Sequence, residues 1–164
     1  MLRRARRGGC EVLVRGAGPP VVCLPGTMAS PLLFQPLADL LDAEVLALPW
    51  LEWPGPHDLD RVAAQVVRVL DATGPAVVVG HSTGGALALL AAAGPGHVSD
   101  CARAVRVPAA VVNGQHDRAR GPVEVGRLAE LLGVAATTVD SGHSPCAEVP
   151  ERFAAVVRDV IARA

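Results

Sequence analysis

The hexapeptide GHSTGG at residues 80–85 decides the fold of this chain, because it lies between two apolar runs. The run before it, 76–79, has the composition of a buried strand, and the run after it, 86–93, is typical of a helix. In the pattern Gly-x-Ser-x-Gly, a serine in this context lies at the tip of a sharp strand-to-helix turn. Glycine lets the two arms of the turn approach closely, because it has no Cβ atom. We therefore expect a strained turn at Ser82, with the first amides of the helix directed toward it.

Short apolar runs alternate with helical patterns along the rest of the chain, which favours a parallel sheet covered by helices. Most runs are continuous in Val, Leu and Ala, as expected for strands buried on both faces. We expect an α/β fold, a three-layer sandwich with one mostly parallel sheet of about six strands. The predicted strands are 11–15, 20–24, 44–48, 76–80, 108–113 and 134–139, and the predicted helices are 36–42, 58–72, 83–93, 123–132 and 151–164.

The length of 164 residues suits one domain, and no repeat or linker divides the chain. We expect a single domain over residues 11–164, preceded by a basic, solvated N-terminal arm over residues 1–10. The arm does not continue into the apolar segment that a secretory signal requires. A formal net charge of −1 argues against a nucleic-acid partner, and no apolar run reaches the length of a membrane span.

The cysteines and histidines indicate which cofactors and which cellular compartment to expect. The four cysteines lack the spacing of a metal or redox motif, which favours a reducing, cytoplasmic setting. The five histidines are scattered and no phosphate-binding glycine loop is present, so we expect neither a metal nor another cofactor. The sequence leaves the oligomeric state open.

Two residues downstream of Ser82 have the chemistry to activate it. A serine hydroxyl is a weak nucleophile unless a base accepts its proton and a third group orients that base. Asp117 and His143 each follow an expected strand, and carboxyl ends of parallel strands meet at one edge of a sheet. We expect Ser82, Asp117 and His143 to meet there. Asp140 is a rival acid, although its position three residues before His143 suits a loop-shaping role better.

The order serine, acid, histidine resembles that of the α/β-hydrolase family, and four pieces of the chain carry the likeness. Residues 22–27 resemble the strand and turn that supply one oxyanion-hole amide, with Pro25 in place of the usual histidine. Residues 80–85 resemble the nucleophile elbow and residues 111–117 the acid turn. Residues 142–153 resemble the histidine loop that runs into the last helix.

This resemblance implies a minimal, lid-less serine hydrolase. Ser82 would be the nucleophile, His143 the general base and then acid, and Asp117 the carboxylate that orients His143. The backbone amides of Thr27 and Thr83 would form the oxyanion hole. The implied small-molecule substrates are carboxylic esters, thioesters or lactones. An acyltransferase would use the same residues.

The chain departs from the family pattern after the elbow helix. Only residues 94–107 separate that helix from the acid strand, and they contain no further Val/Leu-rich run. A parallel neighbour needs a connection of a dozen or more residues, so we expect one central strand and the cap to be absent. The loss either moves the later loops toward Ser82 by about 4.8 Å or leaves a gap in the sheet. A catalytically impaired binding protein or a deletion variant is therefore the alternative.

A second departure follows the strand at 44–48, where the chain places both of its tryptophans. Without a cap, Trp50 or Trp53 would wall an acyl pocket beside Met28 and Leu51. In the alternative interpretation the two tryptophans only cover the helix that follows.

Overall fold

The larger sheet has five strands in the computed structural model, which describes residues 1–164. Strand β3 lies between β4 and β5 and is parallel to both, whereas the hairpin β1–β2 joins β4 in antiparallel orientation. The centre of the sheet is β3, whose last four residues are completely buried because helices cover both faces. In spatial order the strands are β1 (Arg3–Arg7), β2 (Cys10–Arg15), β4 (Glu44–Ala47), β3 (Pro20–Leu24) and β5 (Val77–Gly80).

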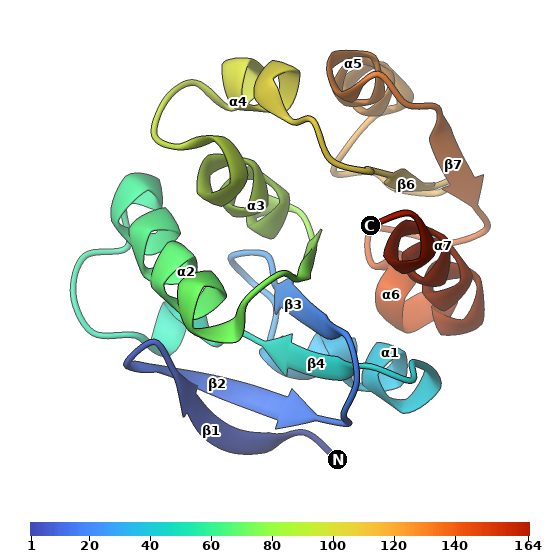
Figure 1. Cartoon of the computed structure of the whole chain (residues 1–164). Coiled ribbons are helices and arrows are strands. Elements are labelled where there is room, and N and C mark those ends of the chain that lie inside the picture. Colours follow the sequence, from blue (N-terminus) through green and yellow to red (C-terminus); the bar gives the residue numbers. More distant parts are fainter.

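A second sheet consists only of β6 (Val111–Gly114) and β7 (Ala136–Val139), which pair in parallel. Figure 1 shows this pair apart from β5, on the side of α6 and α7. The α/β class and the positions of the six expected strands are confirmed. The strands number seven, however, and form two sheets rather than one. The gap therefore persists, because the segment between α3 and β6 forms a helix and an extended linker instead of a strand.

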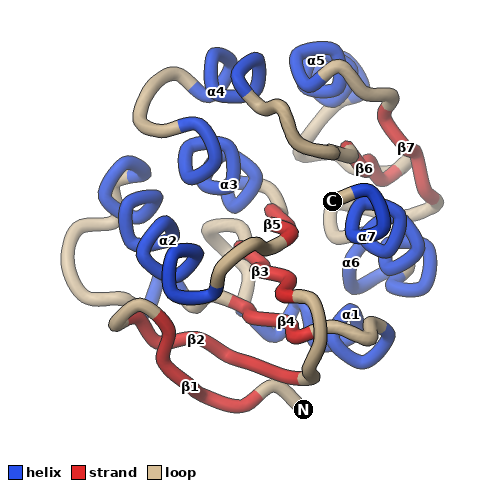
Figure 2. Tube along the Cα trace, viewed as in Figure 1, coloured by secondary structure: helices blue, strands red, loops and turns tan.

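Helices cover the larger sheet on both faces, and all five expected helices are present (Figure 2). Helices α2 and α3 pack on one face, and α1 and α7 pack on the other. Helix α5 lies against β6 and β7. Two short 3₁₀ turns, Pro31–Phe34 and Trp50–Glu52, complete the structure. The helices are α1 (Gln35–Leu40), α2 (Leu59–Thr73), α3 (Thr83–Ala93), α4 (Val98–Ala104), α5 (Pro122–Leu132), α6 (Pro145–Glu148) and α7 (Pro150–Arg163).

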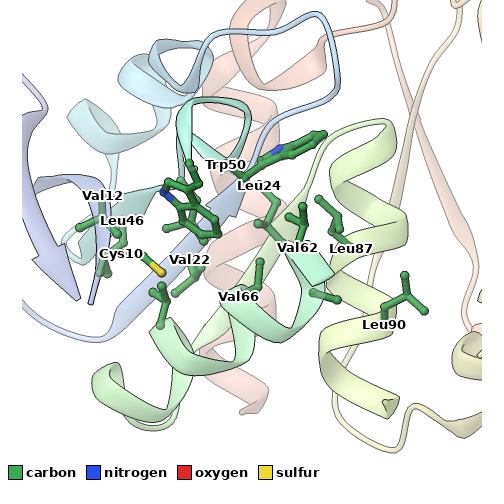
Figure 3. Close-up of a cluster of buried hydrophobic side chains, with 14 of the residues drawn as sticks. Cys10, Val12, Val22, Leu24, Leu46, Trp50, Val62, Val66, Leu87 and Leu90 are labelled. Carbon is green, nitrogen blue, oxygen red and sulfur yellow. The ribbon is translucent and has the colours of Figure 1, made fainter. Parts of the chain in front are cut away.

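The first hydrophobic cluster fills the space between the larger sheet and helices α2 and α3 (Figure 3). Asp58 precedes helix α2 as its N-cap, and its carboxylate accepts the amide hydrogen of Arg61 at 2.9 Å. Its apolar residues recur at helical spacing and face inward. The cluster contains both tryptophans, along with buried residues such as Val22, Leu24, Leu46, Val62, Val66 and Leu87.

The second cluster, on the opposite face of the larger sheet, holds the C-terminal helix α7 against the rest of the chain. Ala154 and Val157 of α7 are buried with residues of α1, and the same cluster includes Val79 of β5 and Cys146 of α6. The C-terminal helix thus packs back onto the larger sheet. This packing positions the loop before α6 near the carboxyl end of β5.

The basic N-terminal segment is a strand, so the expectation of a solvated tail is wrong for residues 3–7. Its backbone pairs with β2, and a two-residue turn of Gly8 and Gly9, both at positive φ, connects the two strands. Arg3, Arg4 and Arg6 are exposed, whereas the half-buried Arg7 forms an ion pair with Glu44 at 2.9 Å. A charged edge strand of this kind disfavours pairing with other chains.

Candidate active site

Ser82 occupies the sharp turn between β5 and α3, as the sequence predicts. It is the only non-glycine residue with a positive φ, 54°. The turn packs so closely that a Cβ atom on Gly84 would lie 2.0 Å from the carbonyl oxygen of Leu24. The glycine is therefore required by the approach of α3 to the end of β3. A non-glycine residue at positive φ is strained, and such strain concentrates at functional sites.

The turn after β3 lies directly against Ser82. A Cβ atom on Gly26 would be 3.0 Å from the Cβ atom of Ser82. The hydroxyl groups of Thr27 and Thr83 hydrogen-bond to each other across the two turns, with 2.7 Å between their Oγ1 atoms. Neither residue's backbone amide is among the groups that hydrogen-bond within the protein. Two free N–H groups therefore flank the serine, one of them at the N-terminus of α3, where the helix dipole favours negative charge.

Asp117 and His143 are brought together by the ends of β6 and β7. The Nδ1 atom of His143 is 2.8 Å from Oδ2 of Asp117, whose side chain is only 7% exposed. The other carboxylate oxygen accepts the amide hydrogens of Ala119 and Arg120, at 2.7 and 3.1 Å. Burial raises the pKa of Asp117, but the hydrogen bonds from His143 and the two amides outweigh it. The pKa therefore lies below its ordinary value, and the carboxylate is ionised at neutral pH.

No hydrogen bond joins Ser82 to His143; the neighbouring His81 makes the contact with the histidine loop instead. The Nε2–H of His81 donates to the carbonyl oxygen of His143 at 3.0 Å. The two imidazole rings meet edge to face, with centroids 4.9 Å apart. Burial lowers the pKa of His81, so this ring is neutral at pH 7. The backbone carrying His143 is thus tied to the turn that carries Ser82.

Two further contacts order the loops around Asp117 and His143. The rival acid Asp140 pairs with His116, 2.9 Å from its Nε2 atom, and both side chains are exposed. Asp140 therefore does not orient His143. A Cβ atom on Gly114 would lie 1.8 Å from the carbonyl oxygen of Gly142, so the end of β6 packs directly on the histidine loop.

Glu148 is a residue to which the sequence pattern assigns no role. Its two carboxylate oxygens accept the amide hydrogens of Gly142 and Ser144, at 2.7 and 2.9 Å. These hydrogen bonds lower the pKa of Glu148 below its ordinary value. Its spacing from the Gly-His pair does not reveal this contact, because only the return of the short helix α6 brings the carboxylate back to the loop.

The expected acyl pocket is different in the structure. Met28 is fully exposed and walls nothing. Trp53 is buried against β2, where its Nε1–H donates to the carbonyl oxygen of Glu11 at 2.9 Å. The placement of these two residues in a pocket beside the serine is therefore wrong, because the loop after β4 turns Trp53 into the core.

Trp50 lines a small cavity of about 160 Å³ beside the turn after β3. The indole is buried, and its Nε1–H donates to the carbonyl oxygen of Pro25 at 2.9 Å, which fixes the start of that turn. The cavity wall consists of Pro25, Ala29, Ser30, Pro31, Pro49, Trp50, Leu51 and Glu52. Trp50 thus serves both in the core and as a wall at the carboxyl edge of the sheet.

Metal-ligating side chains do not gather: no three His, Cys, Asp or Glu residues are arranged to hold a metal ion. A separate observation concerns the helices, none of which combines the length and the apolar character needed to cross a membrane.

Comparison with protein families identifies the family of this fold. A model described as the alpha/beta hydrolase family matches residues 21–136, which include the Ser82 turn and Asp117. The chain belongs to the alpha/beta hydrolase family. Membership of this family makes the protein a hydrolase enzyme. No curated protein matches its sequence.

Solved structures of other α/β-hydrolases have the same fold. An alpha/beta hydrolase enzyme from a sediment metagenome of the lagoon of Mar Chica, Morocco, is 18% identical, with a TM-score of 0.80 and 96% of each chain covered. The enol-lactonase from Burkholderia xenovorans is 16% identical, with a TM-score of 0.79 and coverage of 98% of this chain and 100% of its own. A thermophilic esterase from Thermogutta terrifontis is 16% identical, with a TM-score of 0.77 and 98% of each chain covered.

Proposed function

We propose that this α/β-hydrolase is a serine hydrolase of small carboxylic esters, thioesters or lactones. Ser82 is the nucleophile, His143 the general base and acid, and Asp117 the carboxylate that orients His143. The observation that carries the proposal is the 2.8 Å hydrogen bond between Asp117 and Nδ1 of His143, on loops next to a strained serine turn. That bond leaves Nε2 of His143 available for the serine proton.

The reaction has two halves. Nε2 of His143 takes the hydroxyl proton as Oγ of Ser82 attacks the carbonyl carbon, and the amides of Thr27 and Thr83 stabilise the oxyanion. Collapse of this intermediate breaks the bond to the alcohol or thiol, which leaves with the proton from His143. A water molecule, deprotonated by His143, then attacks the acyl group and releases the acid and free Ser82. The missing Ser82–His143 hydrogen bond fits a free enzyme, since such contacts often shorten only with substrate.

Substrate size is suggested by the open edge of the sheet. No cap covers Ser82, and the cavity lined by Pro25 and Trp50, whose wall includes none of the three proposed catalytic residues, measures only about 160 Å³, so we propose a short acyl or alcohol group. The similar structures include an esterase, an enol-lactonase and a thioesterase domain, all of which act on acyl compounds. No cofactor takes part in the proposed reaction. All four cysteines are free thiols, which fits the cytoplasmic setting that we propose.

The test uses a fluorophosphonate probe and a series of p-nitrophenyl esters of increasing acyl length. Wild-type protein should be labelled and should hydrolyse the short esters, whereas Ser82→Ala should lose labelling and about 10⁴–10⁶-fold in kcat. The matched control is Ser99→Ala, in α4, which should behave as wild type. A folded wild-type protein that neither labels nor hydrolyses any ester would overturn the proposal.

The alternative function is that of a catalytically impaired binding protein or deletion variant. It is favoured by the unpaired edges of β5 and β6 and by the missing hydrogen bond between Ser82 and His143. An acyltransferase is a second alternative, with the same residues. Product analysis with added alcohols or thiols separates it from hydrolysis, because transfer would yield a new ester or thioester instead of the free acid.

A further inference from the structure

The loop that carries His143 is held on both sides of the histidine by one carboxylate. Oε2 of Glu148 accepts the amide hydrogen of Gly142 at 2.7 Å, and Oε1 accepts that of Ser144 at 2.9 Å. These two amides belong to the residues immediately before and after His143. Through Ser144 it binds the peptide group that follows His143, and through Gly142 it binds the peptide group one residue before the one that precedes His143, so it spans the backbone from which the imidazole projects.

The position of Glu148 is itself fixed by the core. It ends the short helix α6, whose residues Pro145 and Cys146 are buried. Cys146 lies in the second hydrophobic cluster, between the larger sheet and α7. Glu148 therefore links the histidine loop to the packed body of the protein, although the carboxylate lies at the surface.

His81 holds the same loop from the opposite direction. Its Nε2–H donates to the carbonyl oxygen of His143, and Ser82 is the next residue in the chain. The peptide group after His143 thus has its carbonyl bound by His81 and its amide, from Ser144, bound by Glu148. With Asp117 on Nδ1, the ring and its backbone are held at separate points.

We propose that Glu148 is a positioning residue for His143. By binding the amides on both sides of it, Glu148 keeps the imidazole in its hydrogen bond with Asp117 and directs Nε2 toward the Ser82 turn. This inference rests on the proposed function of His143 as general base. Glu148 does not touch the reacting atoms, and its effect passes through the backbone of the loop.

A large effect on rate is expected from a small movement of this loop. In enzymes generally, a misplacement of the reacting groups by about 1 Å can cost about 10²-fold in rate. A purely structural carboxylate at the surface would instead change the melting temperature and leave the turnover of the folded protein unchanged. The ratio of these two effects distinguishes the roles.

The experiment compares Glu148→Ala and Glu148→Gln with the wild-type protein. Glutamine keeps one acceptor oxygen and should bind one of the two amides. The matched control is Glu151→Ala, an exposed glutamate in the first turn of α7 that makes no hydrogen bond or ion pair. The measurements are kcat and KM for a p-nitrophenyl ester, the rate of fluorophosphonate labelling, the melting temperature, and the tautomer of His143 from ¹⁵N shifts of its ring.

Positioning predicts that Glu148→Ala lowers kcat and the labelling rate about 10- to 100-fold with KM nearly unchanged. The ring of His143 should change from the Nδ1–H tautomer to a mixture. Glu148→Gln should lie between wild type and Glu148→Ala, and Glu151→Ala should match wild type. If Glu148→Ala does not fold, the glutamine variant carries the same test.

The inference is overturned if both folded Glu148 variants keep the wild-type kcat, labelling rate and His143 tautomer, whatever happens to their melting temperatures. A wild-type protein that is not labelled would instead defeat the proposed function. In that case the tautomer of His143 in the Glu148 variants still decides whether the carboxylate positions the ring.

Discussion

Ser82 has a backbone conformation that glycine adopts easily and serine does not. Its φ of 54° with ψ of −121° lies outside the regions favoured by residues with a Cβ atom. Such a residue costs about 1–3 kcal/mol and persists only where its surroundings enforce it. Here the packing of Gly84 on the end of β3 and the contact of Gly26 with Ser82 do so.

This strain predicts that Ser82→Gly is more stable than Ser82→Ala by about 1 kcal/mol, because only glycine relieves the positive φ. Both variants should be inactive, so the comparison separates strain from catalysis. Urea denaturation at pH 7.5 gives the two free energies of unfolding. Equal stabilities would mean that the serine backbone is not strained.

The neutral state of His81 makes the stability depend on pH. Burial lowers its pKa below the ordinary value, so as pH falls through about 6.5 the unfolded chain binds a proton that the folded protein does not. Stability should therefore decrease from pH 7.5 toward pH 5.5 and level off only below the folded pKa. His81→Gln should show a smaller decrease than wild type in urea titrations at several pH values. His97→Gln, a substitution at an exposed residue, is the control and should keep the wild-type slope. Parallel curves for all three proteins would contradict this account of His81.

Residue types and spacing were sufficient to predict that Ser82, Asp117 and His143 each follow the end of a strand. They did not predict the contacts around these residues. Glu148 and His81 act through backbone groups of the histidine loop, and any residue has such groups. Their contacts therefore depend on how α6 and the Ser82 turn approach the loop. Met28 and Trp53 were misplaced for the same reason, since the course of a loop decides which way its side chains face.

At the scale of elements, the end of β6 and the histidine loop approach so closely that a methyl group does not fit between them. A Cβ atom on Gly114 would lie 1.8 Å from the carbonyl oxygen of Gly142 and 2.6 Å from that of Ser141. Both contacts are with backbone atoms, so a rotamer change cannot relieve them. The loop or the strand must move.

Gly114→Ala is therefore expected to lower the free energy of unfolding by about 1–3 kcal/mol. It should also reduce ester hydrolysis in the protein that remains folded, because the movement carries His143 with it. The matched control is Gly126→Ala in α5, where a Cβ atom meets nothing within 4 Å. That change should raise stability by about 0.5–1 kcal/mol, the usual gain of alanine over glycine in a helix. Urea denaturation and steady-state kinetics measure both variants; a Gly114→Ala protein as stable and active as wild type would show that the contact is loose.

Strands with apolar runs and helices with apolar faces were predictable, whereas β1 was not. The pattern RRARR has one apolar residue in five, and its strand exists because the Gly8–Gly9 turn folds it back onto β2. Side-chain burial contributes little to such an edge strand, so hydrophobic periodicity does not reveal it. The adjacent glycines were the available signal, since two-residue hairpin turns favour them.

For the whole molecule, the division into two sheets follows from the short connection between α3 and β6. Such a short connection allows two outcomes, a shift of the later loops toward Ser82 or a persistent gap. The gap is present, and the two parts are joined by helices: α7 packs on α1, and α4 packs on α3. Which outcome occurs depends on the sum of these helix contacts, and no single motif encodes that sum.

A two-stranded sheet is marginal on its own, so the β6–β7 part is expected to unfold before the larger sheet. Ala136, Thr137 and Thr138 of β7 are exposed, and β6 has no ladder of hydrogen bonds to β5. Both tryptophans lie in the first cluster, beside the larger sheet, and the chain has no tyrosine. Tryptophan fluorescence therefore reports the larger sheet alone, while far-UV circular dichroism reports the whole protein.

In a urea titration, the loss of circular dichroism should begin at lower urea than the change in tryptophan fluorescence. Hydrogen exchange at low urea should show the amides of β6 and β7 exchanging before those of β3 and β4. Gly114→Ala should widen the separation between the two curves by shifting the early phase, because the substituted residue ends β6 and its new Cβ atom meets the loop that follows β7. Superimposable curves with uniform exchange would mean that the helix contacts make the molecule a single cooperative unit despite the gap. The histidine loop, which lies between β7 and α6, would then share the stability of the Ser82 turn instead of opening separately from it.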